Sequence, residues 1–266
     1  KGVGLGGLLF LAGYFSLANG QYKSGLEVLA EQDFADLKGK NVGVVVNHTS
    51  VDQHGKHFIE KAHFTGIRIT AIFSPEHGFK GMAGAGEEVE NGIEPLTGAP
   101  IYSLYSKHKK PTSEMLNKLD IFVFDMQDIG VRYYTYLSTL TNILEAASKN
   151  GIPVLVLDRI NPLGREVEGP ILEDKFKSFV GMHPIPIRHG MTIGELAMMI
   201  NEEGWLSGGV KANLKLIQYK GKPKKDDQIA AFTPSPSPNM PNRKTALNYV
   251  GLCLLEGTNL SEGRGT

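Results

Sequence analysis

The chain has 266 residues, enough for one large domain or for one domain with a smaller partner. Its 28 Lys and Arg residues balance 28 Asp and Glu residues, so charge gives no reason to expect nucleic acid or an anionic membrane surface as a partner. The single cysteine, Cys253, excludes an internal disulfide and a cysteine-based zinc cluster, and its apolar neighbours predict a buried thiol.

The N-terminal residues 1–20 have the layout of a secretory signal peptide. Lys1 precedes an uncharged apolar stretch that runs to about Leu17 and ends in small residues. Glycines within this stretch argue against a membrane-spanning helix, and an uncleaved anchor is the alternative interpretation. We therefore expect a bacterial protein that is exported, either periplasmic or secreted, with any membrane contact made only by an uncleaved signal segment.

Apolar, β-branched runs alternate with helical patterns along the chain, and such runs are typical of strands buried on both faces. The expected strands are residues 41–50, 67–78, 119–130, 152–162 and 214–219. The expected helices are residues 56–64, 112–119, 133–150 and 192–204. Strands that alternate with helices predict an α/β fold with a parallel sheet. Residues 234–241 contain too many prolines for regular structure.

Polar and ionisable side chains follow four of the expected strands. Because ligands bind outside the carboxyl ends of parallel strands, we expect these side chains at one edge of the sheet. They are Asn47, His48, Thr49 and Ser50; Ser74, Glu76 and His77; Asp125, Gln127, Asp128 and Arg132; and Asp158, Arg159 and Asn161. Each could instead cap a helix, form a turn or make a structural ion pair, but a purely structural edge does not need so many charges.

Motifs for cofactors and activated nucleophiles are missing from the sequence. No GxGxxG follows the first strand, and the phosphate-binding loop, the GxSxG elbow and HExxH are absent. The histidines between residues 48 and 63 lack a ligand spacing, so we expect no metal. Carboxylates without a cofactor suggest acid–base chemistry, such as glycoside hydrolysis by a pair of carboxyl groups. Glu76 follows a buried strand, and Glu87 lies in the glycine-rich segment 73–92, whose backbone can approach a ligand closely.

Eight ordered motifs resemble the exo-β-N-acetylmuramidase family, NamZ-type glycoside hydrolases formerly labelled as a domain of unknown function. The motifs are "FSPEHGFKG…AGE", "PIYSLY", "FDMQDIGVRYYTY", "LDRINPLG", "VEGPIL", "PIPIRHGMTIGELA", "PSPNMP" and "LLEGTNLSEGRGT". The resemblance implies a Rossmann-like parallel-sheet domain, a second, smaller α/β domain, and an active site in the cleft between them. We therefore expect domains at residues 21–165 and 166–266. Members of the family continue beyond the last motif, so the second domain is expected to be incomplete at its C-terminus.

The resemblance also implies an activity: release of β-linked N-acetylmuramic acid from the non-reducing end of peptidoglycan fragments, without a cofactor. The substrate would be a muropeptide or a disaccharide. By motif, Glu76 and Glu87 would be the catalytic carboxyl groups, and Arg132, with Arg188 and Arg264 as alternatives, would bind the lactyl carboxylate of the sugar. The residues expected to bind the substrate are His77, Asn47, Gln127, Asp128, Arg132, Tyr134, Asp158, Arg159, His189, Asn239 and Arg264.

Two other functions fit parts of the sequence. A non-catalytic envelope protein could bind muropeptides or sugars in the same two-domain cleft, and it would tolerate replacement of Glu76 or Glu87. A nucleotide-sugar or dehydrogenase-like Rossmann enzyme is a third hypothesis, and the missing glycine fingerprint argues against it.

Overall fold

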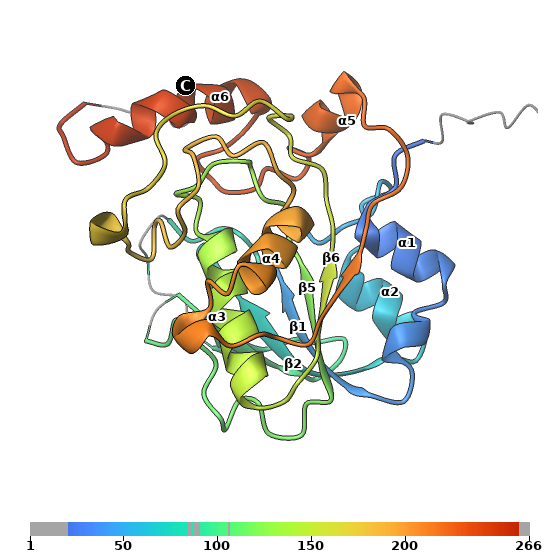
Figure 1. Cartoon of the computed structure of the whole chain (residues 1–266). Coiled ribbons are helices and arrows are strands. Elements are labelled where there is room, and N and C mark those ends of the chain that lie inside the picture. The colour runs from blue at the N-terminus through green and yellow to red at the C-terminus, as the bar shows by residue number, and fades with distance from the viewer. Residues whose placement is uncertain (1–20, 85–86, 88–90, 106, 261–266) are drawn as a thin grey trace, which may run out of the picture.

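The fold is built on one seven-stranded sheet with helices on both faces (Figure 1). The computed structural model describes residues 21–84, 87, 91–105 and 107–260. The strand order is β3-β4-β2-β1-β5-β6-β7, and every neighbouring pair is parallel except β3 with β4. The predicted α/β class with a parallel sheet is therefore confirmed.

All five strands expected from the sequence are present, each shorter than the apolar run that predicted it. The strands are β1 (Asn41–Val46), β2 (Arg68–Ser74), β3 (Gly92–Ile93), β4 (Pro100–Ser103), β5 (Ile121–Asp125), β6 (Val154–Leu157) and β7 (Leu214–Ile217). The sequence did not predict β3 or β4. The first has only two residues, and the second begins with a proline, a residue that is confined in sheets to edges and strand starts.

Side chains of successive strand residues enter two separate apolar cores, because they point alternately to the two faces of the sheet. Val45, Phe122 and Phe124 belong to one core, whereas Val44 and Val123 belong to the other. Both faces are covered, which explains why the strands read as continuous apolar runs.

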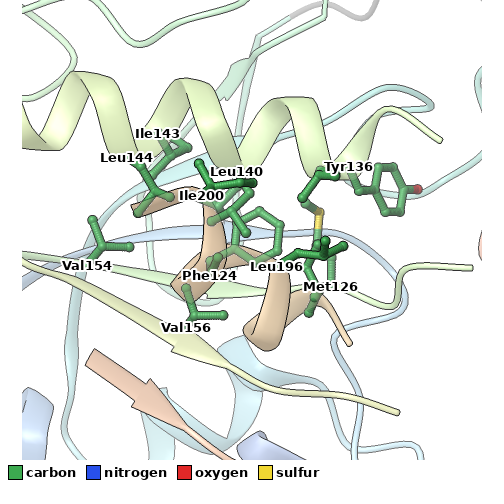
Figure 2. Packing of buried hydrophobic residues seen from close by; sticks show 14 of the residues in the cluster. Phe124, Met126, Tyr136, Leu140, Ile143, Leu144, Val154, Val156, Leu196 and Ile200 are labelled. Atoms are coloured by element: carbon green, nitrogen blue, oxygen red, sulfur yellow. The ribbon is translucent and has the colours of Figure 1, made fainter. Parts of the chain in front are cut away.

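Helices α3 and α4 cover one face of the sheet, and α1 and α2 cover the other. The helices are α1 (Gly25–Glu31), α2 (Phe58–Phe64), α3 (Tyr136–Lys149), α4 (Ile193–Glu202), α5 (Lys225–Ala230) and α6 (Arg243–Leu252). Figure 2 shows Leu140 and Leu144 of α3 beside Leu196 and Ile200 of α4, over Phe124 of β5. Four apolar residues on one face of α3, at helical spacing, are all buried: Leu137, Leu140, Leu144 and Ala147.

Two local predictions were wrong. Residues 112–119 form turns instead of a helix, and Lys118 near the end of these turns has a left-handed φ of 71° that a right-handed helix could not continue through. Thr112 Oγ1 accepts a hydrogen bond from the Met115 amide at 3.4 Å within these turns. Cys253 is partly exposed at the end of α6, although it packs against the core.

The expected domain boundary falls between two strands of the same sheet. β6 precedes residue 165 and β7 follows it, and the two pair along four residues from Val154–Leu214 to Leu157–Ile217. The division into two domains stays a prediction. The expected signal peptide at residues 1–20 lies outside the described part of the chain. Within that described part, none of the helices combines the length and apolar character needed to cross a bilayer.

Candidate active site

A pocket of about 460 Å³ lies beyond the carboxyl ends of β2 and β4. It brings together five of the residues predicted from the sequence: Glu76, His77, Arg132, Tyr134 and Asn239. Glu76 and His77 follow β2, Arg132 and Tyr134 lie between β5 and α3, and Asn239 belongs to the proline-rich segment. The pocket therefore lies at the sheet edge where the parallel topology predicts ligand binding.

The Glu76 carboxylate accepts hydrogen bonds from two hydroxyl groups inside this pocket. Thr135 Oγ1 donates to Glu76 Oε2 at 2.7 Å. Thr135 is also the N-cap of α3, but its side chain caps no amide there. Burial, followed by the charge of Glu76 and a hydrogen bond with it, raises the pKa of Tyr105 to about 12. Tyr105 therefore stays protonated and remains a donor to Glu76 at neutral pH.

The chain reverses sharply just after Glu76. His77 has a φ of 69° and Gly78 a φ of 75°, so two consecutive residues are left-handed. For a non-glycine residue this conformation costs about 1–3 kcal/mol and persists only where the surroundings impose it. The ring of His77 is fixed by a 2.8 Å contact between Nδ1 and the Ala83 carbonyl, which requires the proton on Nδ1. The turn thus fixes Glu76 and His77 at the pocket wall.

Glu87 does not line the pocket. Its side chain is exposed, and Oε2 accepts the Gly84 amide at 2.7 Å. Its neighbours at 85–86 and 88–90 lie outside the described residues, as does Arg264. The catalytic assignment of Glu87 and the substrate-binding assignment of Arg264 stay predictions.

Arg132 and Tyr134 tie together the segments that form the pocket. Arg132 Nη1 donates to the Pro170 and Ile185 carbonyls at 2.7 and 2.6 Å, and burial lowers the pKa of its guanidinium. The Tyr134 hydroxyl donates to the Pro236 carbonyl at 3.0 Å. The proline-rich segment is therefore an ordered wall of the pocket, one of the two roles expected for it.

Other predicted site residues connect the strand ends to one another. Arg159 donates from Nε and Nη2 to the two carboxylate oxygens of Asp125 at 2.6 and 2.9 Å, and from Nη1 to the Val51 carbonyl at 3.1 Å. Arg159 and Asp125 are buried, and Val51 is half-buried. Arg159 and Gln127 also line a second cavity of about 690 Å³ that shares no lining residue with the first.

Asp158 holds the start of α4. Its carboxylate accepts the Thr192 hydroxyl at 3.0 Å and the Gly194 amide at 2.9 Å. Burial raises the pKa of Asp158 to about 6. Asn47 likewise accepts the Thr49 amide at 2.9 Å and donates to the Tyr136 hydroxyl at 2.8 Å. These hydrogen bonds account for buried polar groups without any ligand.

Asp128 and His189 form a buried pair that lines neither cavity. Asp128 Oδ2 accepts the Gly130 amide at 2.7 Å and lies 3.6 Å from His189 Nε2. Within the described residues, Asp128 Oδ1 and His189 Nε2 have no hydrogen-bond partner. The same part of the chain contains no group of three or more His, Cys, Asp or Glu side chains arranged to hold a metal ion.

Several residues of the pocket were missed as individual residues. Tyr105, Thr135 and Glu256 are among them, and each lies in a sequence motif quoted above. Tyr105 belongs to "PIYSLY", Thr135 to "VRYYTY" and Glu256 to "LLEGTN". Membership in a motif was the only available signal, because nothing in their spacing indicates that they meet.

Comparison with known proteins shows the family. The family model described as "Exo-beta-N-acetylmuramidase NamZ, N-terminal" matches residues 42–244. The chain is 46% identical over 246 residues to peptidoglycan beta-N-acetylmuramidase NamZ of Bacillus subtilis strain 168, covering 92% of this chain and 59% of that protein.

Two crystal structures of DUF1343 family proteins from Bacteroides fragilis NCTC 9343 are similar as well. One is 40% identical with a TM-score of 0.77, and the match covers 87% of this chain and 60% of that protein's chain. The other has 39% identity and a TM-score of 0.80, covering 93% and 65%. The chain thus spans less than two thirds of the length of each of these relatives. From its sequence and its fold, the chain belongs to the family of the N-terminal region of NamZ exo-β-N-acetylmuramidases.

Proposed function

We propose that the protein is an exo-acting glycoside hydrolase that releases β-1,4-linked N-acetylmuramic acid from the non-reducing end of peptidoglycan fragments. Membership in the family supports the reaction class and the peptidoglycan substrate. The observation that carries the proposal is Glu76, a half-buried carboxylate that accepts two hydroxyl groups in a 460 Å³ pocket at the sheet edge.

Glu76 acts on the anomeric carbon in this proposal. A carboxylate held by Thr135 and Tyr105 is already oriented, so it can attack the sugar or activate water without reorganising. Glycoside hydrolysis also requires a second carboxyl group, and the family resemblance alone assigns that role to Glu87. The active site lies in a cleft between the sheet domain and a second, smaller α/β domain, and the protein works outside the cytoplasm, in the periplasm or as a secreted enzyme.

Arg132 selects the sugar. Muramic acid differs from N-acetylglucosamine by a lactyl group that carries a carboxylate, and an arginine pairs with a carboxylate through two parallel hydrogen bonds. The structure commits Nη1 of Arg132 to the Pro170 and Ile185 carbonyls, and Arg132 still lines the pocket. Its other guanidinium N–H groups would meet the lactyl carboxylate.

The test compares two chromogenic β-glycosides, one of N-acetylmuramic acid and one of N-acetylglucosamine. We expect release from the muramic substrate only, and Glu76→Gln should lower kcat by about 10²–10⁴-fold. Glu202→Gln is the matched control. Glu202 is the last residue of α4, and its exposed carboxylate pairs with Lys211. Binding of muramic acid without any turnover by the wild-type protein would refute the hydrolase and support the binding protein instead.

A further inference from the structure

Glu256 is a second carboxyl group at the pocket that contains Glu76. It follows α6 and the short 3-10 helix Cys253–Leu255, and its side chain is exposed. The Cys253 thiol lies 3.7 Å from Glu256 Oε2. A substrate in the pocket can therefore reach this carboxyl group, whereas Glu87 lies outside the pocket lining.

The end of α6 is attached to the segment that carries Arg132 and Tyr134. The rings of Tyr133 and Tyr249 pack edge to face with their centroids 5.3 Å apart. The Tyr133 hydroxyl donates to the Tyr249 carbonyl at 2.9 Å and also to the Val250 carbonyl. Tyr133 lies between two pocket residues, Arg132 and Tyr134, so this contact ties the segment that leads to Glu256 to the pocket itself.

Tyr105 lies within electrostatic range of both carboxyl groups. After burial, the charges of Glu76 and Glu256 both contribute to its raised pKa. Glu76 already accepts hydrogen bonds from the Thr135 and Tyr105 hydroxyl groups. Glycoside hydrolysis also needs a carboxylic acid that gives a proton to the leaving oxygen. Glu256 and Glu76 are the two carboxyl groups among the described residues that line the pocket, so Glu256 is placed to supply that proton.

We propose that Glu256 is this second carboxyl group and donates its proton to the glycosidic oxygen. The bond between the anomeric carbon and that oxygen breaks, its electron pair stays on the oxygen, and the Glu256 proton completes the new hydroxyl. Water supplies the oxygen that joins the anomeric carbon, and its proton returns to the carboxyl pair. The assignment rests on the proposed function and replaces Glu87 with Glu256 as the partner of Glu76.

The experiment measures kcat/KM for two β-linked muramic substrates with different leaving groups. The first is the 4-nitrophenyl glycoside, whose leaving group departs without a proton donor, and the second is the disaccharide with N-acetylglucosamine, which needs one. We expect Glu256→Gln to lower kcat/KM about 10²–10⁴-fold for the disaccharide but less than about tenfold for the nitrophenyl glycoside. Glu202→Gln, the matched control at an exposed carboxylate that pairs with Lys211 away from the pocket, should leave both values within about threefold of wild type.

Three results would overturn the assignment. Unchanged activity of Glu256→Gln on both substrates would mean that this carboxyl group takes no part. Equal loss on both would exclude a proton donor, provided that the thermal midpoint shows the variant to be folded. A wild-type protein that is inactive on both substrates would refute the proposed function and this assignment with it, whereas an active wild type isolates the assignment.

Discussion

The ion pair between Asp125 and Arg159 predicts a large loss of stability that is separate from any loss of activity. Asp125 is fully buried at the end of β5, and Arg159 is 6% exposed just after β6. Asp125→Asn keeps the size of the side chain but removes its charge, and it places an amide N–H opposite a guanidinium N–H. The variant leaves a buried arginine without its counter-ion, a change that destabilises proteins by about 3–5 kcal/mol.

Urea denaturation measures this loss. With a slope near the upper end of about 1–3 kcal/mol per M, a loss of this size lowers the urea midpoint by roughly 1–2 M. Removing both partners in Asp125→Leu with Arg159→Met should restore most of the stability, because no buried charge remains. Lys56→Gln breaks the exposed Lys56–Glu60 pair, a matched control that should leave the midpoint unchanged.

The opposite pattern would refute the argument. If Asp125→Asn kept the wild-type midpoint and raised KM for the muramic substrate, Arg159 would bind the substrate, as the sequence led us to expect, and would not brace the sheet. A double variant that is less stable than Asp125→Asn would show that the cavity, and not the unpaired charge, causes the loss.

Three further predictions use other parts of the structure. Burial raises the pKa of Asp158 to about 6, so the folded protein favours the protonated carboxyl group. Its contribution to the free energy of unfolding is complete below the unfolded pKa near 4 and is lost as the pH rises through 6, by roughly 3 kcal/mol in all. Asp158→Asn, which keeps the acceptor for Gly194, should flatten urea midpoints measured from pH 4 to 7, and parallel profiles would contradict this. Leu140→Ala should lower the free energy of unfolding by about 2–5 kcal/mol because its side chain is fully buried, and a loss below about 1 kcal/mol in denaturation would contradict the packing. Arg132→Met should lower kcat/KM about 10–150-fold for the muramic glycoside, since a hydrogen bond to a charged group contributes about 1.5–3 kcal/mol, and an unchanged value would exclude the lactyl contact.

The sheet was predictable because its strands are buried on both faces. A strand such as β5 needs apolar side chains at every position, so it appears in the sequence as an uninterrupted run. β4 lacks this signal because it is a short strand near the edge that begins at Pro100. The turns at 112–119 imitated a helix because capping by Thr112 is local chemistry, whereas the left-handed Lys118 that ends them leaves no periodic trace.

The composition of the strand ends predicted the edge of the sheet but not what each residue does there. Glu76 and Asp158 are both carboxylates that follow buried strands, and nothing local distinguishes them. Asp158 meets Thr192 and Gly194, which approach from the start of α4, whereas Glu76 meets hydroxyl groups that face a pocket. The difference lies in which distant segment arrives opposite the strand end, and that depends on topology and helix packing.

The two kinds of strand end are linked through β5. Its last residue, Asp125, is fixed by Arg159, and the chain that follows it carries Arg132 and Thr135 into the pocket. Thr135 is the N-cap of α3, and the apolar face of α3 is buried against the same sheet. The position of Thr135 is therefore fixed by β5 on one side and by α3 on the other, and its hydroxyl lies 2.7 Å from Glu76 Oε2. An oriented carboxylate needs supporting groups whose own positions are fixed. The buried ion pair fixes the end of β5, and the segment that leaves this strand carries Thr135 to Glu76.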